Sequence, residues 1–301
     1  MVRLEDLVIF VSAADNGSLT AAARQLDVSP AVASAALKRL EVELNARLLA
    51  RSTRSLHLTT DGERYLTYAR NAIAEIEAGR DAVAHGRQAI GGNVSISMPS
   101  DIGRNVFLKW LSEFRSKYPD VHFQLRISDS VSDMFKQPVD VAVRYGKPDD
   151  STLIVLPLDE KNRRVLCSAP RYFQRYGRPV TPSDLSKHNC LRFALSDMVH
   201  SRWTFHHEGE STAVPVTGDL ISDDGEIVHR WALEGLGIAY KSRLDVLDDL
   251  RAGRLEAVME DFEGELAPLS LICTHRLVLS PTINALREFL QTRVKQYQHS
   301  G

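Results

Sequence analysis

The chain has 301 residues, which is too long for one small domain and fits two or three. Its hydrophobic fraction of 44% is sufficient for real cores, and its formal net charge of −2 excludes a uniformly basic protein, so any nucleic-acid contact must be local. No stretch approaches the roughly 20 apolar residues of a membrane helix, and the first residues lack the apolar core of a signal peptide. We therefore expect a cytoplasmic protein without a membrane partner.

The stretch from Ser18 to Leu40 predicts two short helices joined by a tight turn. Ser18 is a good N-cap, and the alanines that follow favour helix and allow close packing. Ser29 caps the second helix with Pro30 in its first position, where a missing N–H costs nothing. Apolar residues at a spacing of three and four form one stripe of this helix, namely Val32, Ala33, Ala36, Leu37 and Leu40. Three polar residues are left to face outward, namely Ser34, Lys38 and Arg39.

The flanking segments extend this hairpin into a larger pattern. An amphipathic helix precedes it over residues 4–14, and residues 44–59 predict a strand, a basic turn and a strand, which together form a wing. Between Ser29 and Thr60, five basic residues stand against two acidic ones. An ordinary helical hairpin in a core is the alternative, but the local positive charge favours a helix-turn-helix whose second helix enters the DNA major groove.

Residues 1–60 resemble the winged helix-turn-helix of LysR-type transcriptional regulators. The resemblance is carried by Phe10, Ser18, Ala21–Ala23, Leu26, Ser29, Ser34, Leu37, Leu40-Glu41, Leu44, Leu48–Arg51, Leu58-Thr59 and Gly62. Double-stranded promoter or operator DNA is the partner that it implies. The DNA-binding residues are predicted to be Ser29, Pro30, Ser34, Lys38, Arg39, Arg51 and Arg54. Two positions depart from the family pattern, because Pro30 and Ala35 stand where the family often has polar residues.

A long helix is predicted from a capping box at Thr60 to about Arg87, as the linker between two domains. Apolar residues form a near-heptad seam along it, interrupted by Arg80. We expect this seam to pair two copies, through Leu66, Ala69, Ile73, Ile76 and Val83. The alternative is a helix that packs on its own domain. The family resemblance implies the pairing, and a homotetramer built as a dimer of dimers.

From Val94 onward, strands and helices alternate, which predicts a parallel α/β sheet. A second α/β unit begins near Arg163, and the strand at 269–274 should return to the first. One lobe interrupted by another resembles the periplasmic-binding-protein-like sensor domain, on Asp140–Gly146 and Glu234–Ile238. The predicted fold class is therefore α/β: a winged helix-turn-helix domain at 1–60, a linker helix at 61–90 and a two-lobed effector domain at 91–301. Lobe I covers about 91–161 and 266–301, and lobe II about 162–265.

Polar residues follow the predicted strands of the first lobe, where open α/β sheets bind small molecules. Ser100 and Ser128 stand before predicted helices, whose N-termini offer N–H groups to anions. Together with Arg144, and with Phe193 and Tyr240 as apolar walls, they predict an effector site for a carboxylate between the lobes. The alternatives are serines that only cap helices and an Arg144 in a surface ion pair.

Enzyme signatures are missing from the sequence: it has no GxSxG, Walker A, HExxH or GxGxxG-after-strand motif. His206-His207 has no third metal ligand at helpful spacing, so an exposed loop pair is favoured over a metal site. Asp149-Asp150 and Asp223-Asp224 are interpreted as helix N-caps.

Three scattered cysteines, Cys167, Cys190 and Cys273, form no CxxC pair, which indicates reduced thiols, with a redox-sensing thiol as the alternative. We expect no catalysis, no cofactor and no metal.

The sequence thus predicts a ligand-responsive DNA-binding regulator, with RNA polymerase as a further candidate partner and the nucleoid as its place when bound to DNA. The alternative is a solute-binding or enzymatic α/β protein whose N-terminal hairpin only dimerises. The effector, the target genes and the sign of regulation are left open.

Overall fold

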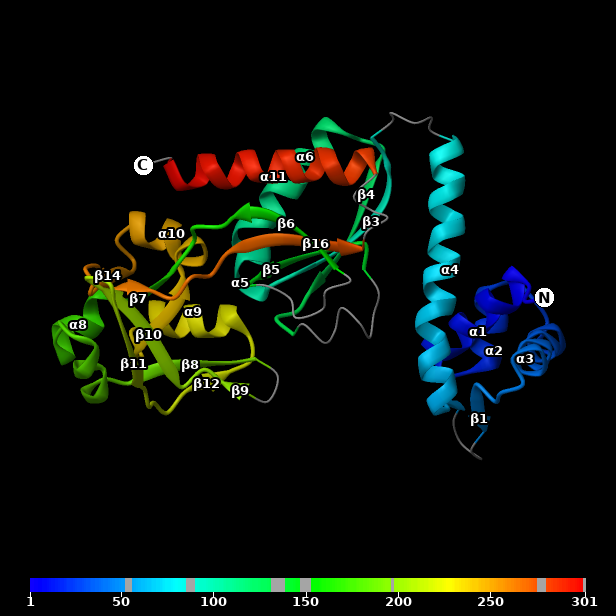
Figure 1. Ribbon diagram of the computed structural model, residues 1–301, viewed down its shortest axis with the longest axis horizontal. Helices are drawn as coiled ribbons and strands as arrows, with labels where there is room; N and C mark the ends of the chain where they lie inside the picture. The colour runs from blue at the N-terminus through cyan, green and yellow to red at the C-terminus, as the bar shows by residue number, and fades with distance from the viewer. Residues whose placement is uncertain are drawn as a thin grey trace. The chain divides into compact units, whose positions relative to one another are not determined.

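The structure, a computed structural model, describes residues 1–51, 56–84, 90–130, 139–146, 153–195, 198–274 and 280–299 (Figure 1). The chain divides into two compact units, one with Met1–Arg87 and the other with Gln88–Met134 and Val139–Gly301. Within the described residues, no helix is both long and apolar enough to cross a bilayer.

The first unit begins with the three predicted helices, α1 (Leu4–Asn16), α2 (Leu19–Gln25) and α3 (Pro30–Leu44). Ser18 and Ser29 are their caps: the Ser18 hydroxyl accepts the Ala21 N–H at 3.3 Å and the Ser29 hydroxyl accepts the Val32 N–H at 3.3 Å. The turn between α2 and α3 passes through Asp27 with φ +53°, a left-handed conformation that a short acidic side chain tolerates. The helix-turn-helix prediction is confirmed.

The apolar stripe of α3 is buried as predicted at Ala33, Ala36, Leu37 and Leu40. Val32 is the exception, because its side chain is 50% exposed. It lies about 100° around the helix from Ala33, on the flank of the stripe rather than in it. The prediction that Val32 belongs to the core was therefore wrong.

The wing forms from β1 (Leu49–Arg51) and β2 (Leu56–Leu58), which pair antiparallel with Leu49 opposite Leu58. The Glu41 carboxylate accepts the N–H groups of Leu48 and Leu49 at 2.8 and 3.2 Å, which ties the end of α3 to the wing. Gly62 is required below it, since a Cβ there would lie 2.0 Å from the Leu48 carbonyl oxygen.

The long helix is α4 (Thr60–Ala84), and its cap is Thr59, one residue earlier than predicted. The Thr59 hydroxyl accepts the Gly62 N–H at 3.0 Å, so Thr60 is already the first helical residue. Leu66 and Ala69 are buried in a core with Leu7 and Phe10 of α1, and Ile73 packs against the same core.

The expected seam along α4 was therefore wrong at Leu66 and Ala69, whose side chains are already covered within their own unit. The exposed face of this half of the helix carries Tyr68, Ala72 and Ile76. The exposed fractions of Tyr68 and Ile76 are 67% and 44%. The side chains of Arg80 and Val83 lie outside the described residues.

The second unit contains a five-stranded sheet of order β4-β3-β5-β16-β6. Its strands are β3 (Gly92–Met98), β4 (Val121–Ile127), β5 (Val141–Tyr145), β6 (Leu153–Asp159) and β16 (Leu269–Thr274). Strands β4, β3 and β5 are parallel, but β16 is antiparallel to both β5 and β6. The expected all-parallel sheet is thus a mixed one, because β16 enters from the second lobe in the opposite direction. Residues 131–138, where the helix predicted to follow Ser128 would lie, are outside the described residues.

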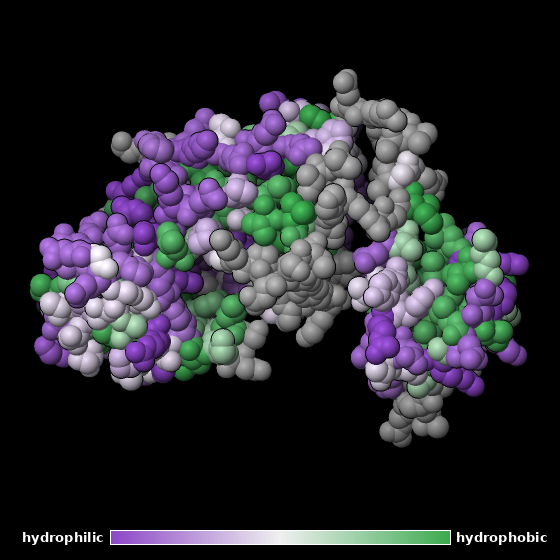
Figure 2. All heavy atoms as spheres, in the orientation of Figure 1, coloured by the Kyte–Doolittle hydropathy of each residue, from purple (hydrophilic) through white to green (hydrophobic). Residues whose placement is uncertain are grey.

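Two helical segments cover this sheet. A continuous stretch runs through α5 (Ser100–Ile102), a π-helical turn (Gly103–Phe107) and α6 (Leu108–Lys117), and α11 (Pro281–His299) packs beside α6. Trp110 meets Tyr297, and Phe114 meets Phe289, in edge-on ring contacts. Leu286 and Leu290 of α11 are buried, while the outer surface over α11 is mainly hydrophilic (Figure 2). We refer to this sheet and its helices as lobe I.

The remaining strands form lobe II, whose main sheet has the order β12-β8-β13-β7-β14, with β9 (Met198–Val199) on β8. The strands are β7 (Arg164–Ser168), β8 (Cys190–Leu195), β12 (Ile221–Ser222), β13 (Ile238–Ser242) and β14 (Glu256–Val258). The helices are α8 (Pro170–Tyr176), a 3-10 turn (Pro182–Lys187), α9 (Gly225–Leu233) and α10 (Arg243–Arg251).

A separate antiparallel sheet of β10 (Arg202–His207), β11 (Glu210–Pro215) and β15 (Glu263–Gly264) was not predicted. His206 and His207 end strand β10 rather than occupying a loop, so this part of the prediction was wrong.

Two crossovers, at 160–163 and 265–268, join the lobes and are tied to each other. Asn162 donates from Nδ2 to the Ser242 hydroxyl at 2.9 Å and to the Ala267 carbonyl at 2.6 Å. The Ala267 N–H in turn donates to the Asn162 carbonyl at 2.8 Å. The interrupted-lobe arrangement predicted from the sequence is confirmed.

Candidate functional site

The start of α3 presents a polar and exposed surface in the first unit. Ser29, Pro30 and Lys38 are exposed and Ser34 is half-buried, all on the side of α3 away from the core. Because Ser29 and Pro30 sit in the first turn, this end of the helix is the part that could approach a major groove.

Arg39 faces outward as predicted, but it also forms an ion pair that was not predicted. Its Nη2 and Nε donate to the buried Asp6 carboxylate of α1 at 2.6 and 3.2 Å. This hydrogen-bonded pair raises the pKa of the Arg39 guanidinium, chiefly through the hydrogen bond to Asp6. The residue therefore ties α3 to α1. Its side chain is still 47% exposed, as the outward-facing position predicted, and its role on DNA stays a prediction.

The basic residues of the wing are only partly described. Arg51 ends strand β1, while its side chain and the whole of Arg54 lie outside the described residues. Their role on DNA stays a prediction.

A cavity of about 130 Å³ lies between the two lobes of the second unit. It is lined by residues of both lobes, namely Pro99, Asp101, Asp129, Arg144, Tyr145, Arg164, Phe193, Leu195, Gly225, Tyr240, Lys241, Ser242 and Asp245. Three of the five residues predicted for an effector site, Arg144, Phe193 and Tyr240, are thus brought together. Ser100 and Ser128 are not part of its wall.

Two guanidinium groups reach this cavity, one from each lobe. Arg144 of β5 is buried, and it donates to the Ser97 hydroxyl at 2.6 Å and to the Val143 carbonyl at 2.7 Å. Arg164 of β7 donates to the Tyr240 carbonyl at 3.3 Å and lies 3.7 Å from the Glu265 carboxylate. The expectation of a surface ion pair for Arg144 does not fit its burial.

The helix N-terminus at Ser100, which was expected to bind an anion, already binds a carboxylate of the chain. Asp129 accepts the Ser100 N–H at 2.9 Å and the Gly225 N–H at 2.9 Å, and the Ser100 hydroxyl also donates to it. The Ser100 hydroxyl accepts the Glu226 N–H at 3.1 Å. Ser100 and Asp129 thus join lobe I to the start of α9 in lobe II. Ser128 accepts the Ser130 N–H at 3.2 Å.

A buried chain of charges runs along one wall of the cavity. The Lys241 ammonium lies 2.6 Å from Asp101 and 3.3 Å from Asp245, and the Tyr145 hydroxyl donates to Asp245 at 2.5 Å. Burial works against the charge on Lys241, but the two carboxylates outweigh it and raise its pKa. Burial also opposes the charge on Asp245, and for this acidic group it raises the pKa, to about 6.

The chain of charges continues into lobe II through His229. Its two ring nitrogens lie 3.0 Å from Asp101 and 3.0 Å from Asp249. Burial would lower the pKa of His229, yet the hydrogen bond and charge of Asp101 raise it. Burial also opposes ionisation of Asp101, but Lys241 and His229 hold the pKa of Asp101 below its ordinary value.

Several of these residues were missed, although the sequence carried a signal for some of them. Lys241 is a charged residue in a strand whose other members are apolar or small, and a charge buried in a strand needs a partner. Asp101 and Asp129 directly adjoin the two serines that were chosen in their place. Arg164 had no local signal, because its role depends on the position of the other lobe.

Other predicted features have plain structural roles. Asp224 caps α9 by accepting the Glu226 and Ile227 N–H groups at 2.8 and 3.1 Å, as expected, whereas Asp149-Asp150 lie outside the described residues. All three cysteines are buried and unpaired, and burial raises the pKa of the Cys167 and Cys190 thiols to about 12. Such thiols are poor nucleophiles. The part of the chain that the structure describes holds no cluster of three metal-ligating side chains.

Comparison with known proteins agrees with both units. Residues 4–63 match the family described as "Bacterial regulatory helix-turn-helix protein, lysR family", and residues 87–295 match the family "LysR substrate binding domain".

Curated relatives and solved structures cover nearly the whole chain. The HTH-type transcriptional activator TtdR of Escherichia coli strain K12 is 31% identical over 97% of this chain and 94% of its own. The HTH-type transcriptional regulator DmlR of the same strain is 32% identical over 96% of this chain and 93% of its own. The full-length structure of the Vibrio cholerae virulence activator AphB shares the fold, with a TM-score of 0.62 and 24% identity over 96% of this chain and 98% of that one.

The helix-turn-helix at one end and the two-lobed domain with its cavity at the other are the two matched parts. Both matched families describe a DNA-binding regulator and not an enzyme. The chain belongs to the LysR family of bacterial transcriptional regulators.

Proposed function

We propose that the effector of this regulator is a small carboxylate held in the cavity between the lobes. The observation that carries the proposal is the pair Arg144 and Arg164, which approach one cavity from opposite lobes. A guanidinium matches the geometry of a carboxylate better than any other side chain.

The size of the cavity limits the ligand. A volume of about 130 Å³ is well below the 300 Å³ or more that drug-sized ligands occupy. Phe193 and Tyr240 provide apolar contact area beside the charges. A metabolite of a few carbon atoms, with a carboxylate at one or both ends, fits this combination.

A ligand in this position can act as a switch. It touches both lobes, so it favours the lobe arrangement in which both guanidinium groups reach it. Coupling of about 1–3 kcal/mol would change DNA affinity roughly 5- to 150-fold.

The test is a thermal-shift screen of small carboxylates, followed by titration of the best compound into Arg164→Gln. We expect a loss of affinity of at least about tenfold. Arg175→Gln is the matched control, because Arg175 is an exposed lobe II arginine outside the cavity wall. Stabilisation by neutral or cationic compounds alone, or full affinity in Arg164→Gln, would show that the carboxylate assignment is wrong.

We further propose that residues 1–60 bind DNA through the start of α3, with Ser29 and Pro30 closest to the groove. In this arrangement Ser34 reads a base edge and Lys38 contacts a phosphate. Arg51 and Arg54 of the wing provide further contacts. Residues 61–90 would then serve as the linker and 91–301 as the effector domain. An electrophoretic shift with DNA from upstream of its own gene tests this. Ser34→Ala should reduce discrimination between sites. Equal loss on specific and random DNA would contradict base reading.

For the oligomer we propose a homodimer through the exposed face of α4, with Tyr68, Ala72 and Ile76, and a homotetramer of two such dimers. A palindromic operator needs both half-site readers. The proposed location is the cytoplasm, at the nucleoid when the protein is bound to DNA, where RNA polymerase is a candidate partner. Sedimentation of the full chain measures the oligomeric state.

A further inference from the structure

A second and larger pocket lies on the side of the hinge formed by the first crossover, α10 and the end of α11. Its volume is about 870 Å³. Its wall contains five cations and only two carboxylates: the cations are Lys161, Arg163, Arg178, Arg243 and Arg251, and the carboxylates are Glu256 and Glu260. We call it the hinge pocket.

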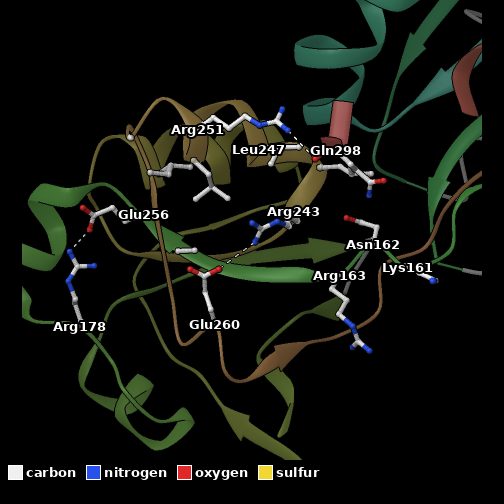
Figure 3. A pocket seen from close by; sticks show the side chains of 15 residues that line it. Lys161, Asn162, Arg163, Arg178, Arg243, Leu247, Arg251, Glu256, Glu260 and Gln298 are labelled. Carbon is white, nitrogen blue, oxygen red and sulfur yellow. Dashed lines mark hydrogen bonds and ion pairs between the residues drawn. The ribbon is translucent and has the colours of Figure 1, made fainter. Parts of the chain in front are cut away.

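The cations of the hinge pocket are unequally neutralised. Arg178 pairs closely with Glu256 at 2.5 Å, and Arg163 with Glu263 at 3.0 Å. Arg243 reaches Glu260 only at 3.9 Å. Figure 3 shows the Arg243 side chain extending across the middle of the pocket toward Glu260.

Two further cations retain donors for a ligand. Arg251 lies 3.9 Å from Asp248, and its Nη2 donates to the Gln298 carbonyl at 3.2 Å. The Lys161 ammonium has no ion pair in the part of the chain that the structure describes, while the Lys161 backbone N–H donates to the Asp159 carboxylate at 2.9 Å. Positive charge that no ion pair closer than 3.9 Å balances is thus carried by Arg243 and Arg251, at the two ends of α10, and by the Lys161 side chain of the first crossover.

The floor of the pocket is apolar. Leu244, Leu247 and Leu255 line it and are at most 7% exposed. An anion above this floor would be partly removed from water, where the attraction of a guanidinium is stronger than at an open surface. The volume is also within the range of sites for small ligands.

The pocket shares one segment with the cavity between the lobes. Lys241, Ser242 and Asp245 line the cavity, while Arg243, Leu244 and Leu247 of the same stretch line the hinge pocket. Asn162, which also lines the hinge pocket, donates to the Ser242 hydroxyl. A ligand that draws Arg243 toward Arg251 and the first crossover therefore acts on the wall of the cavity.

We propose that the hinge pocket is a second ligand site, which binds a small polyvalent oxyanion, either a polycarboxylate or a phosphate compound, and steadies α10 against the first crossover and the end of α11. Binding at this site does not depend on which ligand the cavity takes. Two or more negative charges are needed, because the positive groups that lack close partners are spread apart: Arg243 and Arg251 stand at the two ends of α10, and Lys161 on the first crossover.

The test is calorimetric titration of the full-length protein with citrate and with pyrophosphate, against acetate at matched ionic strength. We expect at least one of the two polyvalent anions to bind, with one ligand per chain. The anion that binds more tightly shows whether the site prefers a polycarboxylate or a phosphate compound. The double variant Arg243→Ala/Arg251→Ala should lose at least about tenfold in affinity. Arg175→Ala, an exposed arginine of the same lobe, should bind as the wild type does.

Two further measurements separate this site from the cavity and from a merely electrostatic effect. Arg164→Gln, which changes a cavity residue that does not line the hinge pocket, should leave binding of the anion unchanged. Hydrogen exchange should slow in residues 243–251 and 161–164 when the anion is bound. Equal binding of acetate, unchanged affinity in the double variant, or binding only of an acidic protein or polymer would overturn the proposal.

Discussion

The two units of this protein use charge in opposite ways. The face of α3 proposed to bind DNA carries the exposed Lys38, and beside it the exposed Arg39 pairs with the buried Asp6. The cavity between the lobes is lined instead by charges that are almost completely buried, with the Lys241 ammonium 2.6 Å from Asp101 and 3.3 Å from Asp245.

The difference follows from what each site must recognise. DNA phosphates are met at a surface, so a binder needs exposed cations whose attraction is weakened by salt. A small effector is surrounded, so its site needs a few charges in fixed positions with low screening. Substitutions should accordingly affect folding strongly in the second unit and affect mainly binding in the first.

The largest effect is expected for Lys241→Met. The change leaves the buried Asp101 and Asp245 without their shared cation, and breaking a buried ion pair in this way costs about 3–5 kcal/mol. Urea unfolding followed by hydrogen exchange in the second unit measures it. Arg230→Met, at an exposed arginine of α9, is the control. A loss below about 1 kcal/mol in Lys241→Met would mean that the buried charges are not coupled as described.

A pair of variants on α4 tests whether the first unit separates folding from assembly. Ile76→Glu places a charge on the exposed face and should yield monomers that bind operator DNA at least about tenfold more weakly, without lowering the melting temperature of the unit. Ile73→Glu should instead destabilise the unit, because Ile73 packs on the core. Sedimentation and thermal melting distinguish the two, and a dimer that survives Ile76→Glu would remove this face from the interface.

The pH dependence of effector binding tests the burial of Asp245. Its pKa is about 6, so lowering the pH from 7 to 5 adds a proton and makes the cavity less negative, and a carboxylate should bind up to about tenfold more tightly. The same raised pKa stabilises the folded state below about pH 4, and this contribution disappears as the pH rises through 6. Titrations at several pH values measure the slope, and Asp245→Asn should flatten it. A pH-independent affinity in the wild type would contradict the assignment.

The smallest effects on DNA binding and stability are expected for two neighbouring residues of α3, Lys38 and Arg39. Lys38→Ala should lower the slope of log affinity against log salt by about one, as loss of one phosphate contact does, with an unchanged melting temperature. Arg39→Ala should show the reverse, a lower melting temperature of the first unit, because Asp6 loses its partner. Arg39→Lys would restore this only in part, since an ammonium cannot make both hydrogen bonds. Equal salt slopes for the two alanine variants would contradict the separation of roles.

The elements of the first unit could be predicted from sequence because their causes are local. Ser18 and Ser29 cap helices through N–H groups three residues away, and the stripe from Ala33 to Leu40 is a repeat within one helix. The same reasoning located most strands of both lobes, since alternation of strands and helices is a property of short segments.

Tertiary structure alone decided which of these residues meet. Asp129 binds the start of α9 across 96 residues of sequence, and Arg39 reaches Asp6 across 33. The face of α4 that lies on α1, and hence the burial of Leu66 and Ala69, depends on the angle at which two helices cross. A local pattern sets which face of a segment is apolar, but the partner of a charge is set by packing between segments that are distant in the chain, so the contents of the cavity could not be read from either lobe by itself.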